Sequence, residues 1–140
     1  MVLLDSDHMS LLQRGSVEGD RIRHRLRALL PDEIATTIIS YEEQMRGWLA
    51  RLARAATLER QVSDYGELKR LLQNYCNIAV LEFDKRAGAE FQRFRQERVR
   101  IGTLDLKIAA IALANDATLL TRNITDFGKV PGLHAEDWSA

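Results

Sequence analysis

Short apolar runs alternate with longer amphipathic segments along this chain, and this alternation most constrains its fold. The apolar runs are bounded by polar residues, and one of them is β-branched, as expected of buried strands. The predicted strands are Val2 to Leu4, Ile34 to Ile39, Ile78 to Phe83, Ala117 to Thr121 and a tail strand near Val130 to Ala135. Strands that alternate with helices indicate an α/β domain with a mainly parallel sheet. A chain of 140 residues suits one such domain, so we expect a single domain over residues 1–140.

Helices are predicted between the strands because apolar residues recur there at helical spacing. The expected helices cover residues 6–13, 17–30, a stretch that begins at Ser40, residues 58–75, residues 84–98 and a stretch after Thr103. Pro31 and Asp32 break the second helix. We expect the third and fourth helices to pair as an antiparallel hairpin.

Composition excludes several classes of protein. Twenty basic and twenty acidic side chains cancel, which excludes a simple polycation that coats nucleic acid but leaves a locally basic groove open. The longest apolar runs are too short for a membrane span. Cys76 is the only cysteine, so no intramolecular disulfide forms, and no signal-peptide pattern opens the chain. These two features favour a reducing cytoplasm.

Four acidic residues follow predicted strands or begin predicted helices. They are Asp5, Glu43, Asp105 and Asp126. Because the carboxyl ends of parallel strands share one edge of a sheet, where ligands of open α/β sheets bind, we expect these four side chains to converge. Glu42 competes with Glu43, since periodicity alone does not choose between them.

Each acid also has a purely local interpretation. Glu43 fits a capping box with Ser40. Asp105 could complement a helix dipole, and Asp126 could stabilise a turn. Asp7, close to Asp5, could cap the first helix. These alternatives apply to the residues singly and remain open at this point.

A convergent cluster needs a cation. Two carboxylates about 5 Å apart repel by ~3 kcal/mol at an effective dielectric constant of ~20. A helix N-terminus stabilises a nearby carboxylate by only ~0.3–1 kcal/mol. Hard oxygen ligands of this kind favour Mg²⁺ or Mn²⁺. The sequence therefore predicts a divalent-metal site, provided that the four acids meet.

The acids lie in segments that carry a family resemblance. The segments are Leu3 to His8, Ser40 to Gly47, Asp105 to Ala110, Thr121 to Phe127 and the terminal Glu136 to Trp138. In their order and spacing they resemble PIN-domain ribonucleases, specifically VapC-like toxins of type II toxin–antitoxin systems, over nearly the whole chain. The family's spacing from Ser40 to Gly47 selects Glu43 over Glu42. The chain departs from the family at Asp7, where Asn is usual.

The resemblance implies a three-layer fold, with helices flanking the sheet and the hairpin as a protruding arm. It implies a toxin that hydrolyses phosphodiester bonds in RNA, with a cognate antitoxin and a homodimer as partners. The implied ligands of one or two Mg²⁺ or Mn²⁺ ions are Asp5, Glu43, Asp105 and Asp126. Ser6, Asp7 and Asn123 would support the site, and Arg122 and Arg46 would contact RNA.

Three other functions remain open from the sequence. The fold could serve as an inactive RNA-binding or protein-binding module. Asp5-Ser6-Asp7 is similar to the start of haloacid-dehalogenase-like phosphatases, although Met9 replaces the Thr or Val expected there and no later lysine or acidic pair is evident. DNA could replace RNA, because the RNA preference rests wholly on the resemblance. His8 could act as a general base or serve as a structural residue.

Overall fold

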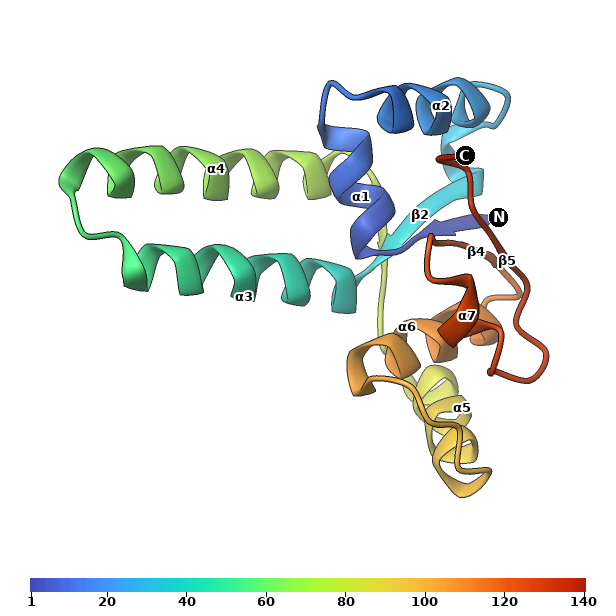
Figure 1. Cartoon of the computed structure of the whole chain (residues 1–140). Coiled ribbons are helices and arrows are strands. Elements are labelled where there is room, and N and C mark those ends of the chain that lie inside the picture. Colours follow the sequence, from blue (N-terminus) through green and yellow to red (C-terminus); the bar gives the residue numbers. More distant parts are fainter.

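A five-stranded parallel sheet forms the centre of the computed structural model, which describes all 140 residues (Figure 1). The strands are β1 (Val2–Leu4), β2 (Ile34–Thr37), β3 (Ala79–Leu81), β4 (Thr118–Leu120) and β5 (Ala135–Glu136). The helices are α1 (Ser6–Gln13), α2 (Val17–Leu26), the short 3₁₀ turn η1 (Pro31–Glu33), α3 (Ile38–Arg54), α4 (Leu58–Cys76), α5 (Lys85–Gln96), α6 (Thr103–Ala114) and α7 (Ile124–Phe127). The predicted α/β class with a parallel sheet is confirmed.

The two faces of the sheet are covered by different helices, which makes three layers. Side chains alternate between the faces along a strand. Leu3 packs into a cluster with residues of α5 and α6, whereas its neighbours Val2 and Leu4 pack into a second cluster with residues of α1, α2 and α4. Both faces of β1 are therefore buried, which explains why this strand is a continuous apolar run.

The strand order is β3-β2-β1-β4-β5, and it places a topological switch between β1 and β4. The chain builds outward from β1 through β2 to β3 and then returns to the other side of β1 with β4. In open sheets of this kind, the crevice at the carboxyl ends of the strands beside the switch is the usual ligand site. The residues directly after β1 and β4 are Asp5 and Thr121, and the Asp5 amide donates to the carbonyl of Leu120 at 3.1 Å.

Helices α3 and α4 form an antiparallel hairpin that protrudes from the body as an arm, as the resemblance implied (Figure 1). At its base, the rings of Tyr41 and Tyr75 meet edge to face, with centroids 5.1 Å apart. Further out on α3, the guanidinium of Arg51 lies 4.7 Å from the ring centre of Trp48. None of the seven α-helices combines the length and apolar character needed to cross a lipid bilayer.

Several observed elements differ from the predicted ones. Strand β2 ends at Thr37 rather than Ile39, and the tail strand covers only Ala135–Glu136 rather than the predicted Val130 to Ala135. Helix α2 ends at Leu26 rather than near residue 30. Helix α3 begins at Ile38 rather than Ser40, because the hydroxyl of Thr37 accepts the Ser40 amide at 2.9 Å and caps the helix. The short helix α7 was not predicted, since four residues are too few to show a helical period.

Candidate metal and catalytic site

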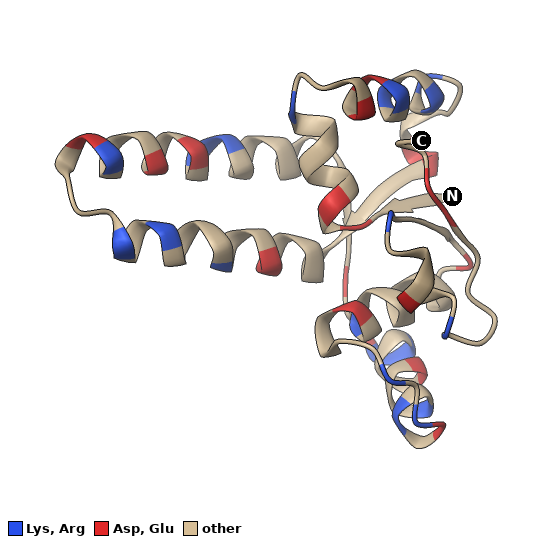
Figure 2. Cartoon of the chain, viewed as in Figure 1, with Lys and Arg blue, Asp and Glu red and all other residues tan.

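An acidic cavity of about 330 Å³ lies at the carboxyl end of β1, between α1, α3 and α6. Its lining residues are Asp5, Ser6, Asp7, Ser10, Glu43, Asp105, Asn123 and Phe127. Figure 2 shows acidic segments of α1, α3, α6 and α7 around this central region. A larger cavity of about 860 Å³ lies beside the amino ends of β2 and β3, but it contains no carboxylate. The acidic cavity is therefore the candidate for catalysis.

Asp5 is the most buried of the four predicted acids, with 6% of its surface exposed. It is the N-cap of α1, where one of its oxygens accepts the His8 amide at 2.8 Å. Burial raises the pKa of Asp5 to about 6, the charges of Asp7 and Asp105 add to the rise, and hydrogen bonds from the His8 amide and the Thr121 hydroxyl oppose it. Asp5, rather than Asp7, is therefore the cap of the first helix.

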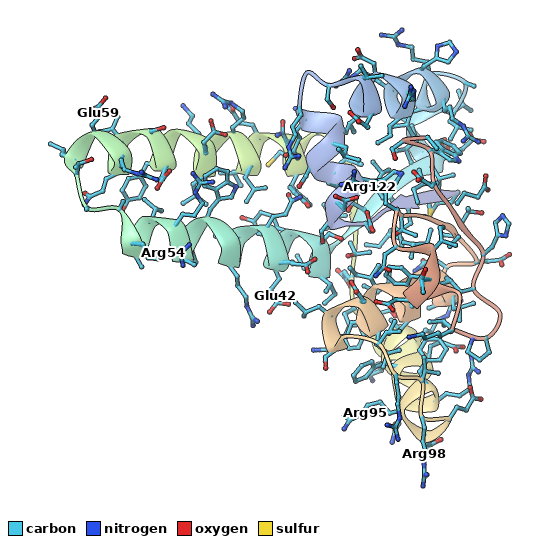
Figure 3. The ribbon with its side chains drawn as sticks, viewed as in Figure 1. Glu42, Arg54, Glu59, Arg95, Arg98 and Arg122 are labelled. Carbon is cyan, nitrogen blue, oxygen red and sulfur yellow. The ribbon has the colours of Figure 1, made fainter.

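Glu43 faces the cavity from α3 and accepts a hydrogen bond from the hydroxyl of Ser6. Next to it, the side-chain amide nitrogen of Gln44 donates to the backbone carbonyl of Ser6 at 2.7 Å. Helix α3 is therefore attached to the start of α1 at two points. Glu42 instead pairs with Arg46 at 2.6 Å on the outer side of α3 (Figure 3). Because Thr37 caps α3, the capping-box interpretation of Glu43 is wrong.

Asp105 lies in the first turn of α6 and lines the same cavity. Its pKa is raised, first by burial and then by the charges of Glu43 and Asp126. The charge of Asp105 also raises the pKa of Asp5. Asp105 therefore interacts electrostatically with all three of the other acids. Simple complementation of the helix dipole does not explain Asp105, because that interaction lowers the pKa of a carboxyl group.

Asp126 lies at the rim rather than inside the cavity. Its side chain is 39% exposed, and Lys129 lies 3.4 Å from it. Asn123 caps α7 and donates from its amide nitrogen to Asp126 at 3.1 Å. The Asn123 hydrogen bond and the nearby Lys129 lower the pKa of Asp126. The fourth acid is thus ionised and held by Asn123, and it is more open to solvent than Asp5.

Asp7 and Arg122 form a bidentate pair at the edge of the cavity, with nitrogen-to-oxygen distances of 2.5 Å and 2.7 Å (Figure 3). The Asp7 hydrogen bond and charge raise the pKa of Arg122. Arg122 therefore neutralises the extra negative charge that Asp7 brings to the site. This pair also places a guanidinium beside the acidic cluster, ready to meet an anionic ligand if Asp7 releases it.

A second grouping of potential metal ligands consists of Asp5, Asp7 and His8, whose ligand atoms lie within 4.8 Å of one another. His8 fits poorly as a ligand. Its side chain is fully buried, and its Nε2 accepts the Trp138 amide at 3.2 Å. In the neutral ring the proton is then on Nδ1, which lies 3.7 Å from Asp5. Burial lowers the pKa of His8, so the structural interpretation is favoured over a general base.

Sequence reasoning missed the residues that fix the acids in place. Thr121 and Gln44 hold Asp5 and Ser6, and Trp138 holds His8 through a backbone hydrogen bond. Tyr75 reaches from α4 toward the same site, where burial and the charges of Glu43 and Asp5 raise its pKa. The position of Thr121 directly after β4, opposite Asp5, was the one signal available from the sequence.

Comparisons with known proteins place this geometry in a family. Residues 2–133 match the PIN domain. Ribonuclease VapC2 of Rickettsia felis is 46% identical over 65 residues, which cover 44% of this chain and 48% of that protein, so the chain spans about half the length of this relative. Ribonuclease VapC1 of the same organism is 24% identical over 132 residues, covering 94% of this chain and 92% of the relative.

Solved structures share the fold over the whole chain. VapBC-1 from nontypeable Haemophilus influenzae superposes with a TM-score of 0.76 at 22% identity and full coverage of both chains. A toxin–antitoxin complex from Klebsiella pneumoniae superposes with a TM-score of 0.68 at 22% identity and 95% coverage of each chain. At these identities the structures establish the three-layer fold with its arm.

Proposed function

The chain belongs to the PIN domain family, and on that basis we propose that it is a Mg²⁺- or Mn²⁺-dependent endoribonuclease, the toxin of a toxin–antitoxin pair. The observation that carries this proposal is the meeting of Asp5, Glu43 and Asp105, from three distant stretches of chain, in one cavity. The names of the relatives as ribonucleases support the reaction class. We further propose that the protein acts in the cytoplasm.

The residues at the cavity fit a hard divalent cation. Asp5, Glu43, Asp105 and Asp126 offer carboxylate oxygens only, which is the donor set that Mg²⁺ and Mn²⁺ prefer. The raised pKa values of Asp5 and Asp105 mean that these carboxylates are buried close to like charges without a compensating cation among the side chains. A bound divalent ion would lower the pKa of a coordinated water and neutralise charge on the phosphate.

The surrounding side chains hold these carboxylates for that task. Ser6 donates to Glu43, and the Thr121 hydroxyl favours the ionised form of Asp5 by lowering its pKa, so both carboxylates are supported as anions. Asn123 does the same for Asp126 at the rim. Ser6 and Asn123 thus support the acids, rather than acting only as contacts for the phosphate.

The two arginines proposed to contact RNA differ in their surroundings. Arg122 lies at the edge of the cavity and can exchange Asp7 for a phosphate, since a guanidinium binds either group through two hydrogen bonds. Arg46 pairs with Glu42 on the outer side of α3. Arg122 is therefore the better of the two for holding the scissile phosphate.

The arm is the proposed surface for the antitoxin and for a homodimer. Four exposed apolar side chains lie on one face of α4: Leu58, Val62, Tyr65 and Leu72. An apolar stripe on an otherwise polar helix is typical of a surface that another chain covers. A solved toxin–antitoxin complex shares this fold, which supports an antitoxin as a partner of the chain.

The proposal is tested by cleavage of single-stranded RNA with and without Mn²⁺, by the wild-type protein and two variants of adjacent residues. Glu43→Gln should abolish metal-dependent cleavage, because it removes a metal-binding charge. Glu42→Gln is the matched control and should keep the wild-type rate, since Glu42 pairs only with Arg46. Equal rates for all three proteins, or cleavage that persists in a chelator, would contradict the proposal.

A further inference from the structure

An RNA chain that enters the acidic cavity needs positive charge along its path, because every phosphate is repelled by the carboxylates. Three basic side chains around the site are already paired with acids. These pairs are Arg122 with Asp7, Lys129 with Asp126 and Arg46 with Glu42. The rest of the nucleic-acid path must therefore use cations from another part of the surface.

Uncommitted cations gather on α5, on the connector after it and on α6. Arg95, Arg98, Arg100 and Lys107 take part in no ion pair. Figure 2 shows basic residues along α5 and its connector, below the acidic centre. In Figure 3, Arg95 and Arg98 extend from the lower end of α5. Positive charge on this side of the site is therefore free for phosphates.

The same surface contains a cavity of about 340 Å³ between α5, the connector and the start of α6. Its wall is largely apolar, with an arginine and a threonine at its polar side: Phe91, Arg95, Val99, Ile101, Thr103 and Leu106. A cavity of this size falls within the range of small-ligand sites, which are about 300–1,000 Å³.

The chemistry of the wall suits a flat aromatic ligand. Phe91 is half-buried, and Phe83 meets it edge to face, with ring centres 5.9 Å apart. The guanidinium of Arg95 lies 5.7 Å from the centre of the Phe91 ring, and the ammonium of Lys107 lies 5.8 Å from it. Aromatic rings and guanidinium planes are the groups on which unstacked RNA bases lie.

The cavity and the acidic site meet the same first turn of α6, and Asp105 Oδ2 lies 3.9 Å from the position that a Cβ at Gly102 would take, next to Ile101 and Thr103. Thr103 and Leu106 line the apolar cavity, and Asp105 between them lines the acidic one. One helical turn rises only ~5.4 Å, so the two cavities lie within one turn of each other along α6, on different sides of the helix. We propose that the cavity at Phe91 and Arg95 is a nucleobase subsite, which holds the base of a nucleotide next to the scissile phosphate. This inference rests on the proposed ribonuclease function.

The subsite gives the enzyme a way to select single-stranded RNA. A base can enter the cavity only if it leaves its own stack, which costs least in a loop or an unpaired strand. Arg95 then covers the base, while the other free cations of this surface meet the phosphates on either side. Recognition by stacking tolerates any base, so preference among the four bases comes from the shape of the apolar wall.

The test uses a short single-stranded RNA in Mn²⁺, together with a series of the same RNA in which each nucleotide in turn is abasic. Rates and cleavage positions are measured for the wild-type protein, Phe91→Leu, Phe91→Tyr and Arg95→Gln. Arg54→Gln is the matched charge control, because Arg54 lies at the far end of the arm (Figure 3). Thermal melting shows whether each variant is folded.

We expect one abasic position next to the cleaved bond to slow the wild-type protein ~10-fold, the loss expected when one stacked base is removed. That penalty should disappear in Phe91→Leu and remain in Phe91→Tyr, which keeps the ring. Arg95→Gln should slow cleavage of the intact RNA, and Arg54→Gln should not.

Two failures are distinguishable. A wild-type protein that cleaves the RNA but shows no abasic penalty, or the same penalty in folded Phe91→Leu, overturns the subsite and leaves the proposed function intact. A wild-type protein that does not cleave RNA in Mn²⁺ overturns both.

Discussion

At the scale of single residues, Asp5 meets two opposing demands. Its carboxylate must be ionised to bind a cation, yet it lies almost wholly out of solvent at the end of β1. Hydrogen bonds from the His8 amide and the Thr121 hydroxyl stabilise the ionised form only in part, because the pKa remains raised to about 6. The protein without metal is therefore less stable than its packing alone would allow.

The first prediction concerns the pH dependence of that effect. The folded protein retains the Asp5 proton that the unfolded chain releases near pH 3.8, so stability is lost as pH rises from there through about 6. Since each pKa unit is worth about 1.4 kcal/mol, the loss at neutral pH is ~3 kcal/mol. Asp5→Asn keeps the helix cap and should raise the free energy of unfolding near neutral pH by ~1–3 kcal/mol.

Urea unfolding in a chelator measures this difference. The gain from Asp5→Asn should vanish below pH ~4, because the wild-type Asp5 carboxyl is then protonated in both the folded and the unfolded protein. A gain of equal size at acidic and neutral pH would show that the ionisation of Asp5 is not its cause. RNA cleavage should be lost in the same variant.

Glu42 and Glu43 show where residue-level prediction from the sequence ends. Both follow Ser40 closely and both lie on α3, so periodicity left the choice open, and the family spacing selected Glu43. In the structure Ser6 binds Glu43 from α1, and Arg46 binds Glu42 on the helix surface. A contact between residues 37 positions apart decides the matter, and no local pattern encodes it.

At the scale of elements, the close approach of α1 and α2 depends on Gly19. A methyl group at Gly19 would lie 2.2 Å from the carbonyl oxygen of Leu11 and 2.9 Å from that of Arg14. Both atoms belong to the backbone and cannot rotate away. Helix α2 therefore packs against the end of α1 only because residue 19 has no side chain, and α1 carries Ser6 and Asp7 of the site.

The second prediction follows from this contact. Gly19→Ala should lower the free energy of unfolding by ~1–3 kcal/mol, the usual cost of forcing an extra methyl into a packed contact. Gly66→Ala in α4 is the control, because no atom lies within 4 Å of the added methyl. It should be neutral or stabilising by up to ~1 kcal/mol, since alanine favours a helix over glycine. Denaturant unfolding of both variants makes the comparison, and equal effects would refute the packing argument.

Element boundaries were less predictable than element types. The strands and the longer helices follow from hydrophobic period, but the start of α3 depends on which of two hydroxyl residues caps it. Thr37 and Ser40 are both good caps by composition. Because Thr37 ends β2 with its side chain aimed at the Ser40 amide, α3 begins two residues earlier than predicted. Glu43 therefore lies in the second turn rather than the first.

At the scale of the whole molecule, a net charge of zero conceals a strong separation of charge. Carboxylates from α1, α3, α6 and α7 surround the central site, while free arginines lie on α5 and its connector (Figure 2). These carboxylates repel one another when no cation is present. Metal binding is therefore expected to stabilise the entire fold.

The third prediction is a thermal shift. Mn²⁺ at about 100 times its dissociation constant should stabilise the protein by ~2.7 kcal/mol, which raises the melting temperature by several degrees. Glu43→Gln should reduce the shift and Glu42→Gln should not. Identical shifts in all three proteins would mean that the ion binds elsewhere.

The fourth prediction concerns the arm. Val62 is 66% exposed in the middle of the apolar stripe on α4, so a charge there should prevent another chain from covering it. Val62→Lys should shift the proposed homodimer toward monomer in sedimentation velocity. Ser63→Lys, on the adjacent exposed position, is the control. A wild-type protein that is monomeric at all concentrations, or a dimer that tolerates Val62→Lys, would contradict the proposed dimer surface.

The sequence by itself determined the alternation of strands and helices, because burial on both faces of a parallel sheet requires continuous apolar runs and the covering helices require a period of 3.6 residues. It also determined that acids follow the strands. Only the tertiary structure decided that Asp5, Glu43 and Asp105 share one cavity, that Asp126 stays at its rim, and that Asp7 is bound by Arg122. Those outcomes depend on the strand order and on contacts between distant segments, which a one-dimensional pattern does not contain.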